Sequence, residues 1–406
     1  MIHQPLHKHK DAQASIREKA TVIFDELDLA ATSKYENGCN TCTGTYDSWI
    51  RGECECECTP DHDHDHPYPS KRCEYFDLHG FLKVPSFANE SEIAAMKKQM
   101  HNLVEKEWHP NDGSKKPTVF RTDDKQIEEQ GSDDYFLESS NKVHFFAESS
   151  AMTSDGKLKE EFLQDKISAL NKAGHGMHVR PGAFHEYTTS KSLRALVEEL
   201  GWVDPVVPQS MYIFKQKKVG GAVTSHQDST FLYTTPKQTC LGLWLALDDA
   251  TITNGCLWVR PGSHREKTRV KFSRNPEHFG QDIIRNRSNI AKGDTTKSQM
   301  IFIDEPTPID ANANANLKPI DWVGKVPDGC DTPWDSLFEA GFVPVECKAG
   351  DLVVFPGELD HLSLENTSET NRHTFQLHLV EGDKAGVTWA DTNWLQYPKG
   401  TQFLRI

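Results

Sequence analysis

The hydrophobic pattern of the chain changes period at about residue 205, and this change constrains the fold more than any other feature of the sequence. Before it, apolar residues recur at helical spacing, as in 93–104 and 193–200. After it, apolar runs of strand length alternate with turns rich in Gly and Pro. Helices first and strands afterwards predict an α+β, mainly β fold rather than alternating βαβ units. The strand-rich half predicts a sandwich or jelly-roll barrel with flanking N-terminal helices.

The same pattern predicts the individual elements. A helix is expected after Asn89, because Glu92 stands three residues further on, as in a capping box. Further helices are expected over 16–30, 158–172 and 192–200, and Gly201 should end the last one. Residues 109–135 are polar and should form a surface loop. Strands are expected at 81–84, 143–146, 211–215, 241–247, 255–260, 352–355 and 374–379.

Two stretches differ from this globular pattern. The first 73 residues contain six of the ten cysteines and an alternating Asp-His run at 61–66. Their C-x-x-C and C-x-C-x-C spacings are typical of metal ligands but match no zinc-finger template, so a zinc knuckle and a flexible tail both stay open. Residues 286–345 are irregular, as in a lid or an insertion. We therefore expect a Cys/His-rich N-terminal extension over 1–72 and a domain over 73–406 that contains this insertion.

Charge and composition argue against several classes of function. The net charge is −15 and no long stretch is basic, so nucleic acid and anionic membranes are not expected as partners. No apolar run approaches the length of a membrane span. With no apolar h-region at its N-terminus and no S-K-L at its C-terminus, the chain is expected to be cytoplasmic, with reduced thiols. Cys240 and Cys256 lie in apolar runs and should be core residues. The sequence does not indicate an oligomeric state.

A His and a carboxylate one residue apart can bind the same metal ion, and two such pairs stand out. Chance copies are expected among 19 histidines. His9 and Asp11 lie in a polar tail that cannot exclude water. His226 and Asp228 follow a Gly-Gly turn and precede Phe231, at the expected mouth of the barrel. The second pair is therefore the better candidate for part of a two-His-one-carboxylate site, the pattern that binds Fe(II) in non-haem oxygenases.

The third ligand must be a histidine that returns to the same mouth. His361 fits best, because it follows a strand and a turn and Arg372 comes eleven residues later. A dicarboxylate co-substrate needs a guanidinium, whose fork geometry Lys cannot match. The weaker candidates are His264, His373 and His378. Among these, His373 would point away from the face of Arg372, and His264 has no Arg at hairpin distance.

Taken together, these motifs resemble the phytanoyl-CoA dioxygenase family. The similarity extends from about residue 75 to 396 and rests on Trp244, Arg372 and the segments 130–137, 209–216, 226–228, 254–264, 361–363 and 393–396. It implies a cupin-like double-stranded β-helix that uses Fe(II), 2-oxoglutarate and O2, and it leaves ascorbate open as an activator. Residues 1–72 have no counterpart in the family, and the stretch 286–345 is bulkier than expected.

The resemblance also implies roles for individual residues. The catalytic iron ligands of the family fall on His226, Asp228 and His361. The pair that binds the distal carboxylate of 2-oxoglutarate falls on Ser363 and Arg372. Further co-substrate contacts fall on Lys172, Met211, Gln227 and Trp244. Without the resemblance, Lys172 would be assigned to a helix surface, Trp244 to the core, and Met211 could equally be structural.

The implied reaction is hydroxylation of a small lipid-like or acyl substrate with release of succinate and CO2. The carboxylate of Asp228 favours hydroxylation, because related halogenases are expected to have a small residue there. Three alternatives stay open: acyl-CoA 2-hydroxylation, a non-catalytic sensor of iron and 2-oxoglutarate, and a zinc-binding protein built on the N-terminal motifs. The sequence contains no substrate signature, and Phe231, Leu232 and Tyr233 are the first candidates either to face substrate or to pack in the core.

Overall fold

Two antiparallel β-sheets form the centre of the computed structural model, which describes residues 13–23, 71–110, 117–120, 133–280, 294, 296–305 and 333–406. The larger sheet includes the short strand β16 (Leu404–Arg405), which pairs with Val206 and Val207 of β4 (Pro205–Ile213). The larger sheet has the spatial order β1 (Leu82–Val84), β12 (Leu352–Pro356), β7 (Leu241–Ala246), β14 (Thr374–Glu381), β4 (Pro205–Ile213), β3 (Leu170–His175) and β2 (Val143–Ala147).

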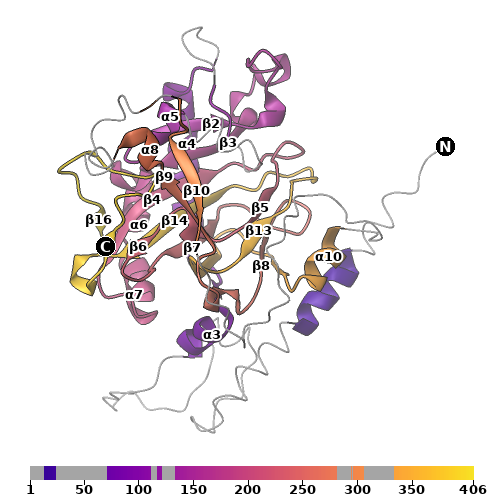
Figure 1. Cartoon of the computed structure of the whole chain (residues 1–406). Coiled ribbons are helices and arrows are strands. Elements are labelled where there is room, and N and C mark those ends of the chain that lie inside the picture. The colour runs from indigo at the N-terminus through magenta and orange to yellow at the C-terminus, as the bar shows by residue number, and fades with distance from the viewer. Residues whose placement is uncertain are drawn as a thin grey trace.

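The smaller sheet has the order β11 (Val343–Val345), β8 (Leu257–Val259), β13 (His361–Ser363) and β5 (Val223–His226). In Figure 1, β5, β13 and β8 lie to the right of β4, β14 and β7. Both sheets line the same cavity, with Met211 and Trp244 from the larger sheet and Leu257 and Ser363 from the smaller one. The sheets therefore face each other across this cavity, and the predicted jelly-roll core with flanking helices is confirmed.

Alternation along the central strands separates the cavity from the hydrophobic core. On β14, Phe375 and Leu377 are buried in the core, whereas Gln376 and His378 line the cavity. The core face packs against helices α4 (Glu90–Glu107), α6 (Ala183–Thr188) and α7 (Lys191–Glu199), and the ring of Phe184 in α6 lies 4.8 Å from that of Phe375. Within the described ranges, no helix is both long and apolar enough to cross a bilayer.

Helix α4 begins where the capping box predicts. The side chain of Asn89 accepts a hydrogen bond from the Glu92 amide at 3.0 Å, and the Glu92 carboxylate accepts one from the Asn89 amide at 2.8 Å. Two of the amides that a helix start leaves unpaired are satisfied in this way. Helix α7 also matches its prediction, with Ser190 as its N-cap and Gly201 after its end at a φ of +93°.

The helix predicted over 158–172 is wrong. The structure has two 3-10 turns there, η3 (Glu160–Phe162) and η4 (Lys166–Ala169), and strand β3 follows. Strand β3 contains no β-branched or aromatic residue, so its intrinsic propensity gives no strand signal. It is nevertheless extended because it pairs with β2 on one side and with β4 on the other.

Parts of the predicted insertion 286–345 belong to the sheets. Strand β10 (Met300–Asp304) pairs with β9 (Val270–Arg274), and β11 pairs with β8 of the smaller sheet. Helix α10 (Pro333–Glu339) precedes β11, and the remainder of this stretch lies outside the described residues. The sequence pattern also did not predict several short elements: α3 (Lys71–His79), α5 (Asp134–Leu137), α6, α8 (Pro276–Phe279), β5, β13, β16 and the pair β6 (Thr234–Thr235) and β15 (Thr388–Trp389).

A helix over residues 13–23 packs against the domain, beside α10 (Figure 1). Ile16 is 3% exposed and belongs to the main core, and Arg17 donates to both carboxylate oxygens of Glu346 at 2.8 and 3.1 Å. Lys19 lies 2.7 Å from Asp335 of α10. The expected domain boundary at residue 73 thus leaves out a segment that contacts the domain. The rest of the helix predicted over 16–30, and the Cys/His motifs up to residue 66, lie outside the described residues.

We expect Asn89→Ala to lower the free energy of unfolding by about 1 kcal/mol, because it removes the N-cap of α4. Urea denaturation followed by far-UV circular dichroism measures this difference. Asn89→Asp keeps a capping oxygen and should stay close to the original stability. Equal stabilities for Asn89→Ala and Asn89→Asp would contradict a stabilising role for this cap.

Candidate active site

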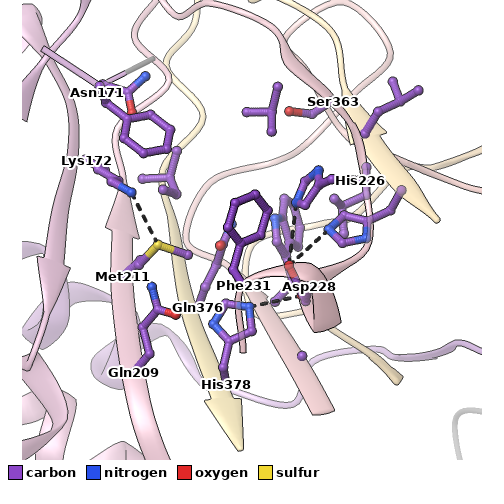
Figure 2. Close-up of a pocket in the computed structure, with 18 of the residues that line it drawn as sticks. Asn171, Lys172, Gln209, Met211, His226, Asp228, Phe231, Ser363, Gln376 and His378 are labelled. Atoms are coloured by element: carbon purple, nitrogen blue, oxygen red, sulfur yellow. Dashed lines mark hydrogen bonds and ion pairs between the residues drawn. The ribbon is translucent and has the colours of Figure 1, made fainter. Parts of the chain in front are cut away.

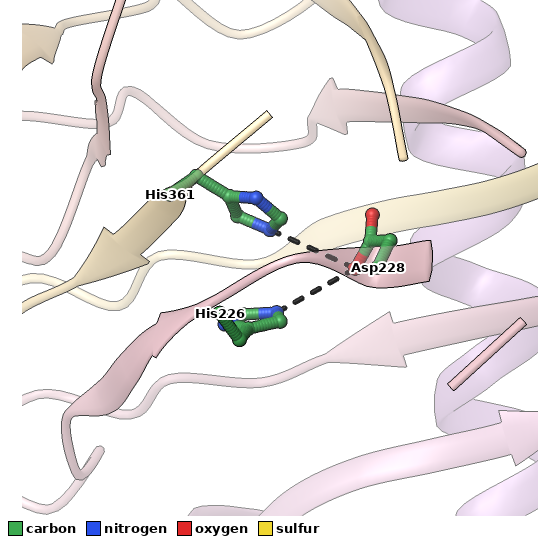
Figure 3. Close-up of side chains that lie close together, drawn as sticks. All are labelled: His226, Asp228 and His361. Carbon is green, nitrogen blue, oxygen red and sulfur yellow. Dashed lines mark ion pairs between the residues drawn. The ribbon is translucent and has the colours of Figure 1, made fainter. Parts of the chain in front are cut away.

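Three side chains from two neighbouring strands converge at one point (Figure 3). His226 ends β5, Asp228 opens the 3-10 turn η6 (Asp228–Thr230), and His361 opens β13 opposite His226. The Nε2 atoms of His226 and His361 lie 3.5 and 3.7 Å from the same oxygen, Oδ1 of Asp228. One ligand atom of each residue lies within 4.8 Å of the others, close enough to share one metal ion. We call these three residues the His-Asp-His cluster.

Backbone carbonyls fix the tautomers of both histidines. Nδ1 of His226 lies 2.7 Å from the carbonyl oxygen of Thr224, and Nδ1 of His361 lies 3.0 Å from that of Leu359. A carbonyl oxygen only accepts, so each Nδ1 carries the proton and donates it. Each neutral ring therefore presents the lone pair of Nε2 toward Asp228, which is the form that binds a metal.

His378 orients the carboxylate of the cluster. Its Nε2 lies 3.0 Å from Oδ2 of Asp228, so that oxygen is occupied and Oδ1 is left facing the two imidazoles (Figure 2). Burial alone would raise the pKa of Asp228, but His378, His361 and His226 outweigh burial and hold its pKa well below the ordinary value. The carboxylate is therefore ionised, and through Oδ1 it can act as a one-oxygen ligand.

Proton and metal would compete within the cluster. Burial and the neighbouring His226 lower the pKa of His361 to about 4. At His226, burial lowers the pKa, but the interaction with Asp228 outweighs burial and raises it. A cation held by all three groups would displace the proton that Nε2 of His226 carries when its imidazole is charged, because metal ligands must be deprotonated.

The cluster opens onto a cavity of about 1260 Å³, its open mouth included. Arg372 lines this cavity, is 2% exposed, and forms no ion pair with a carboxylate among the described residues. Its Nε atom is buried without a hydrogen-bond partner, and its guanidinium carbon lies 5.4 Å from the ring centroid of Trp244. Burial lowers its pKa to about 10, which still leaves it charged at neutral pH. A buried cation of this kind requires an anion, so this end of the cavity suits a carboxylate.

Lys172 is buried in the same cavity, and the sequence taken alone had favoured a helix surface for it. It lies on β3, is 3% exposed, and places its Nζ 3.9 Å from the sulfur of Met211 and 3.4 Å from the ring centroid of Phe120 (Figure 2). Burial lowers the pKa of Lys172 well below its ordinary value. The cavity thus brings together most of the predicted co-substrate residues: Lys172, Met211, Trp244, Ser363 and Arg372.

Gln227 is not among the residues that line the cavity, which corrects the expectation of a co-substrate contact. Side chains alternate along an extended segment, so Gln227 points away from the side of His226 and Asp228. Its amide nitrogen donates to the carbonyl of Glu358 at 2.8 Å, and its amide oxygen accepts from the backbone amide of Arg269 at 3.0 Å. Gln227 therefore joins three segments of backbone beside the cluster.

Of the three histidines that competed for the third ligand position, only His378 reaches the site. Nε2 of His264 lies 2.9 Å from the carbonyl of Asp77, and Nδ1 of His373 lies 2.8 Å from the hydroxyl of Tyr212. The contact of His378 with Asp228 was not predicted from the sequence. A signal was present, because Arg372, two residues before β14, and His378 within it are an even number of residues apart, which in an extended segment points both side chains to one side.

Aromatic and aliphatic side chains line the part of the cavity that the cluster faces. Of the three residues for which the sequence left a cavity or a core position open, Phe231 and Leu232 line the cavity. The hydroxyl of Tyr233 lies 3.0 Å from that of Thr392, and this residue is not in the lining. Among the lining residues that were not predicted from the sequence are Phe120, Phe136, Gln209, Phe272 and Trp394.

Fold and site together define a class: a jelly roll that holds a His-Asp-His cluster between its two sheets, the arrangement of metal-dependent oxygenases. The family model described as Phytanoyl-CoA dioxygenase matches residues 76–374. The chain belongs to the phytanoyl-CoA dioxygenase family and is an oxidoreductase.

Relatives with about one-third sequence identity match this chain over nearly their whole length. Phytanoyl-CoA dioxygenase of Arabidopsis thaliana is 36% identical over 326 residues, which are 80% of this chain and 93% of that protein. Phytanoyl-CoA dioxygenase domain-containing protein 1 of Mus musculus is 35% identical over 322 residues, 79% of this chain and 92% of that protein.

Matches among solved structures are more distant. The epimerase SnoN, in complex with Fe3+, alpha ketoglutarate and nogalamycin RO, has a TM-score of 0.46 and 14% identity, over 82% of this chain and 90% of that one. EctD from S. alaskensis in its apoform has a TM-score of 0.43 and 13% identity, over 79% of this chain and 80% of that one.

We expect Lys172→Met to raise the free energy of unfolding by roughly 1 kcal/mol, because it replaces a buried cation with an apolar side chain of similar length. Chemical denaturation measures the change. Lys142→Met, at a half-exposed lysine outside the cavity, should leave the stability nearly unchanged. A loss of stability in Lys172→Met would mean that the ammonium group is needed for folding.

Proposed function

We propose that this chain is an Fe(II)- and 2-oxoglutarate-dependent dioxygenase that hydroxylates a small organic substrate with release of succinate and CO2. The observation that supports this best is the combination, in one cavity, of the His-Asp-His cluster with the buried guanidinium of Arg372. 2-Oxoglutarate is a dicarboxylate, so one end can reach a metal at the cluster while the other meets Arg372.

The donor set of the cluster fits Fe(II). His226 and His361 would bind it through Nε2 and Asp228 through Oδ1, which leaves positions open for co-substrate and dioxygen. When bound, iron with 2-oxoglutarate supplies the oxidising chemistry, and the protein supplies orientation and a dry cavity. His378 keeps Oδ2 of Asp228 turned away from the metal position.

The co-substrate would lie along β14, between the cluster and Arg372. Arg372 and Ser363 are assigned to its distal carboxylate, since a guanidinium fork binds both oxygens and a hydroxyl adds a donor. Trp244 covers the guanidinium and keeps water away from it. Met211 on β4, which pairs with Gln376 of β14, and Lys172 on β3 line the same sheet beside it and limit where the co-substrate can lie.

The substrate would meet the apolar part of the cavity. Phe231 and Phe272 pack against each other at 5.6 Å there, and Leu232 and Trp394 are almost fully buried beside them. Such a lining suits a small, largely apolar molecule, lipid-like or acyl. Acyl-CoA 2-hydroxylation is the narrower alternative, favoured by the name of the Arabidopsis thaliana relative. We assign the proposed dioxygenase activity to residues 73–406 together with the helix over 13–23.

Anaerobic addition of Fe(II) and 2-oxoglutarate to the full chain should give a weak visible charge-transfer band. Asp228→Ala should abolish the band, because it removes a ligand. Arg372→Lys should keep the band but raise the Kd for 2-oxoglutarate roughly 10- to 100-fold, because charged hydrogen bonds of this kind are worth about 1.5–3 kcal/mol. Arg274→Lys is the matched control, since Arg274 is buried but does not itself line the cavity, and it bonds only to backbone carbonyls, those of Asn393 and Trp394.

Absence of the band in folded protein would contradict the proposed function. A band without succinate formation, in assays with ascorbate across acyl-CoAs and free acids, would instead favour a sensor that binds iron and 2-oxoglutarate without turnover.

A further inference from the structure

A buried polar network ties together the two segments that carry the histidines of the cluster. Its centre is Asp360, which is 2% exposed and precedes His361. Oδ1 of Asp360 accepts from the hydroxyl of Ser225 at 2.6 Å, and Ser225 precedes His226. Oδ2 accepts from Arg260 at 3.0 Å and from Arg269 at 3.1 Å. We call Ser225, Arg260, Arg269 and Asp360 the Asp360 network.

The backbone of Asp360 is held as firmly as its side chain. Its amide donates to the hydroxyl of Ser263 at 2.9 Å, and its carbonyl accepts from the amide of Arg260 at 3.0 Å. Arg260 in turn forms two hydrogen bonds with the carboxylate of Glu266, at 2.7 and 2.8 Å. With Glu266 as the second carboxylate, the charges of Arg260 and Arg269 are balanced and both carboxylates are paired, so the network has one well-defined arrangement.

The network lies directly beside the carbonyls that orient the two imidazoles. Ser225 follows Thr224 and Asp360 follows Leu359, and these are the two residues whose carbonyls accept from Nδ1 of His226 and His361. The bond between Ser225 and Asp360 therefore joins the chain at the two places where the ring orientations are set. A shift of either segment would move an Nε2 atom relative to Oδ1 of Asp228.

Arg269 of the Asp360 network also contacts Gln227, the residue between His226 and Asp228. The backbone amide of Arg269 donates to the side-chain oxygen of Gln227, whose nitrogen donates to the carbonyl of Glu358, two residues before Asp360. Arg269 thus bridges the two ligand-bearing segments, with its guanidinium on Asp360 and its backbone amide on Gln227. The bond from Gln227 to the carbonyl of Glu358 joins the same segments directly.

We propose that Asp360 is a positioning residue: through Ser225, Arg260 and Arg269 it sets the separation and orientation of His226 and His361, and so the affinity and geometry of the metal they bind. This inference rests on the proposed function, because it requires that the cluster hold a metal. Partners of metal ligands commonly contribute a factor of 10 to 100 in metal affinity, which gives the expected size of the effect.

A purely structural role is the competing explanation. Buried ion pairs often contribute little net stability, yet removing one partner destabilises because the other charge is left unpaired. Loss of stability in an Asp360 variant would therefore not distinguish the two roles. Metal affinity and the spectrum of the bound metal do distinguish them.

The test is a titration of the full-length chain with Co(II), followed by its visible d–d bands and by competition with a chelator. Asp360→Asn keeps the shape of the side chain but removes its charge, and we expect about 10-fold weaker Co(II) binding and shifted bands. Asp351→Asn is the matched control, because Asp351 is a buried carboxylate that accepts from the amides of Ser86 and Lys348 away from the cluster. It should lower Tm without changing Co(II) affinity or bands.

Co(II) affinity and bands like those of the original chain in Asp360→Asn would overturn the proposal, whatever happens to Tm. If Asp360→Asn does not fold, Ser225→Ala decides, since it removes only the 2.6 Å bond and leaves the charges paired. A several-fold weaker affinity in Ser225→Ala supports the proposal, and an unchanged affinity overturns it. Failure of the original chain to bind Co(II) at all would contradict the proposed metal site, and this inference with it.

Discussion

The pairing of β13 with β5 is the constraint on which the site depends. This pairing places His361 opposite His226 and so brings together two residues that are far apart in the sequence. A slip of one residue would turn either imidazole to the other face of the sheet. Strand β8 fixes the other side of β13, with His361 opposite Val259. The Asp360 network adds a second set of bonds at the same place, so backbone pairing and side-chain bonds specify the same register.

The cavity keeps charges that a protein selected only for stability would not bury. Arg372 and Lys172 are both buried and face the same space, and among the described residues neither forms an ion pair with a carboxylate. Burial acts against both charges and lowers the pKa of each. Such groups are costly in an otherwise apolar fold, and they are retained where a ligand supplies the opposite charge. The cavity is therefore suited to an anionic co-substrate, and its buried charges lower the stability of the fold.

Local patterns predicted much of this molecule. Apolar runs of strand length marked most strands of the larger sheet but only β8 of the smaller one, and the spacing of Asn89 and Glu92 marked the start of α4. Strand β3 was missed because it has no β-branched or aromatic residue and is extended only through its two neighbours. The outward position of Gln227 followed from strand alternation, but the family resemblance had assigned it a direct contact. The bond from His378 to Asp228 joins residues far apart in sequence, and strand alternation indicates only the face of His378 and not its partner. The Asp360 network also joins distant residues, and no local pattern encodes it.

The central claim is that His226, Asp228 and His361 bind one iron ion, with a 2-oxoglutarate molecule between it and Arg372. Anomalous diffraction at the iron edge, from crystals grown anaerobically with Fe(II) and 2-oxoglutarate, tests it most directly. We expect one strong iron peak between the two Nε2 atoms and Oδ1 of Asp228, with co-substrate density reaching the guanidinium of Arg372. An iron peak elsewhere, or a co-substrate that does not contact Arg372, would contradict it.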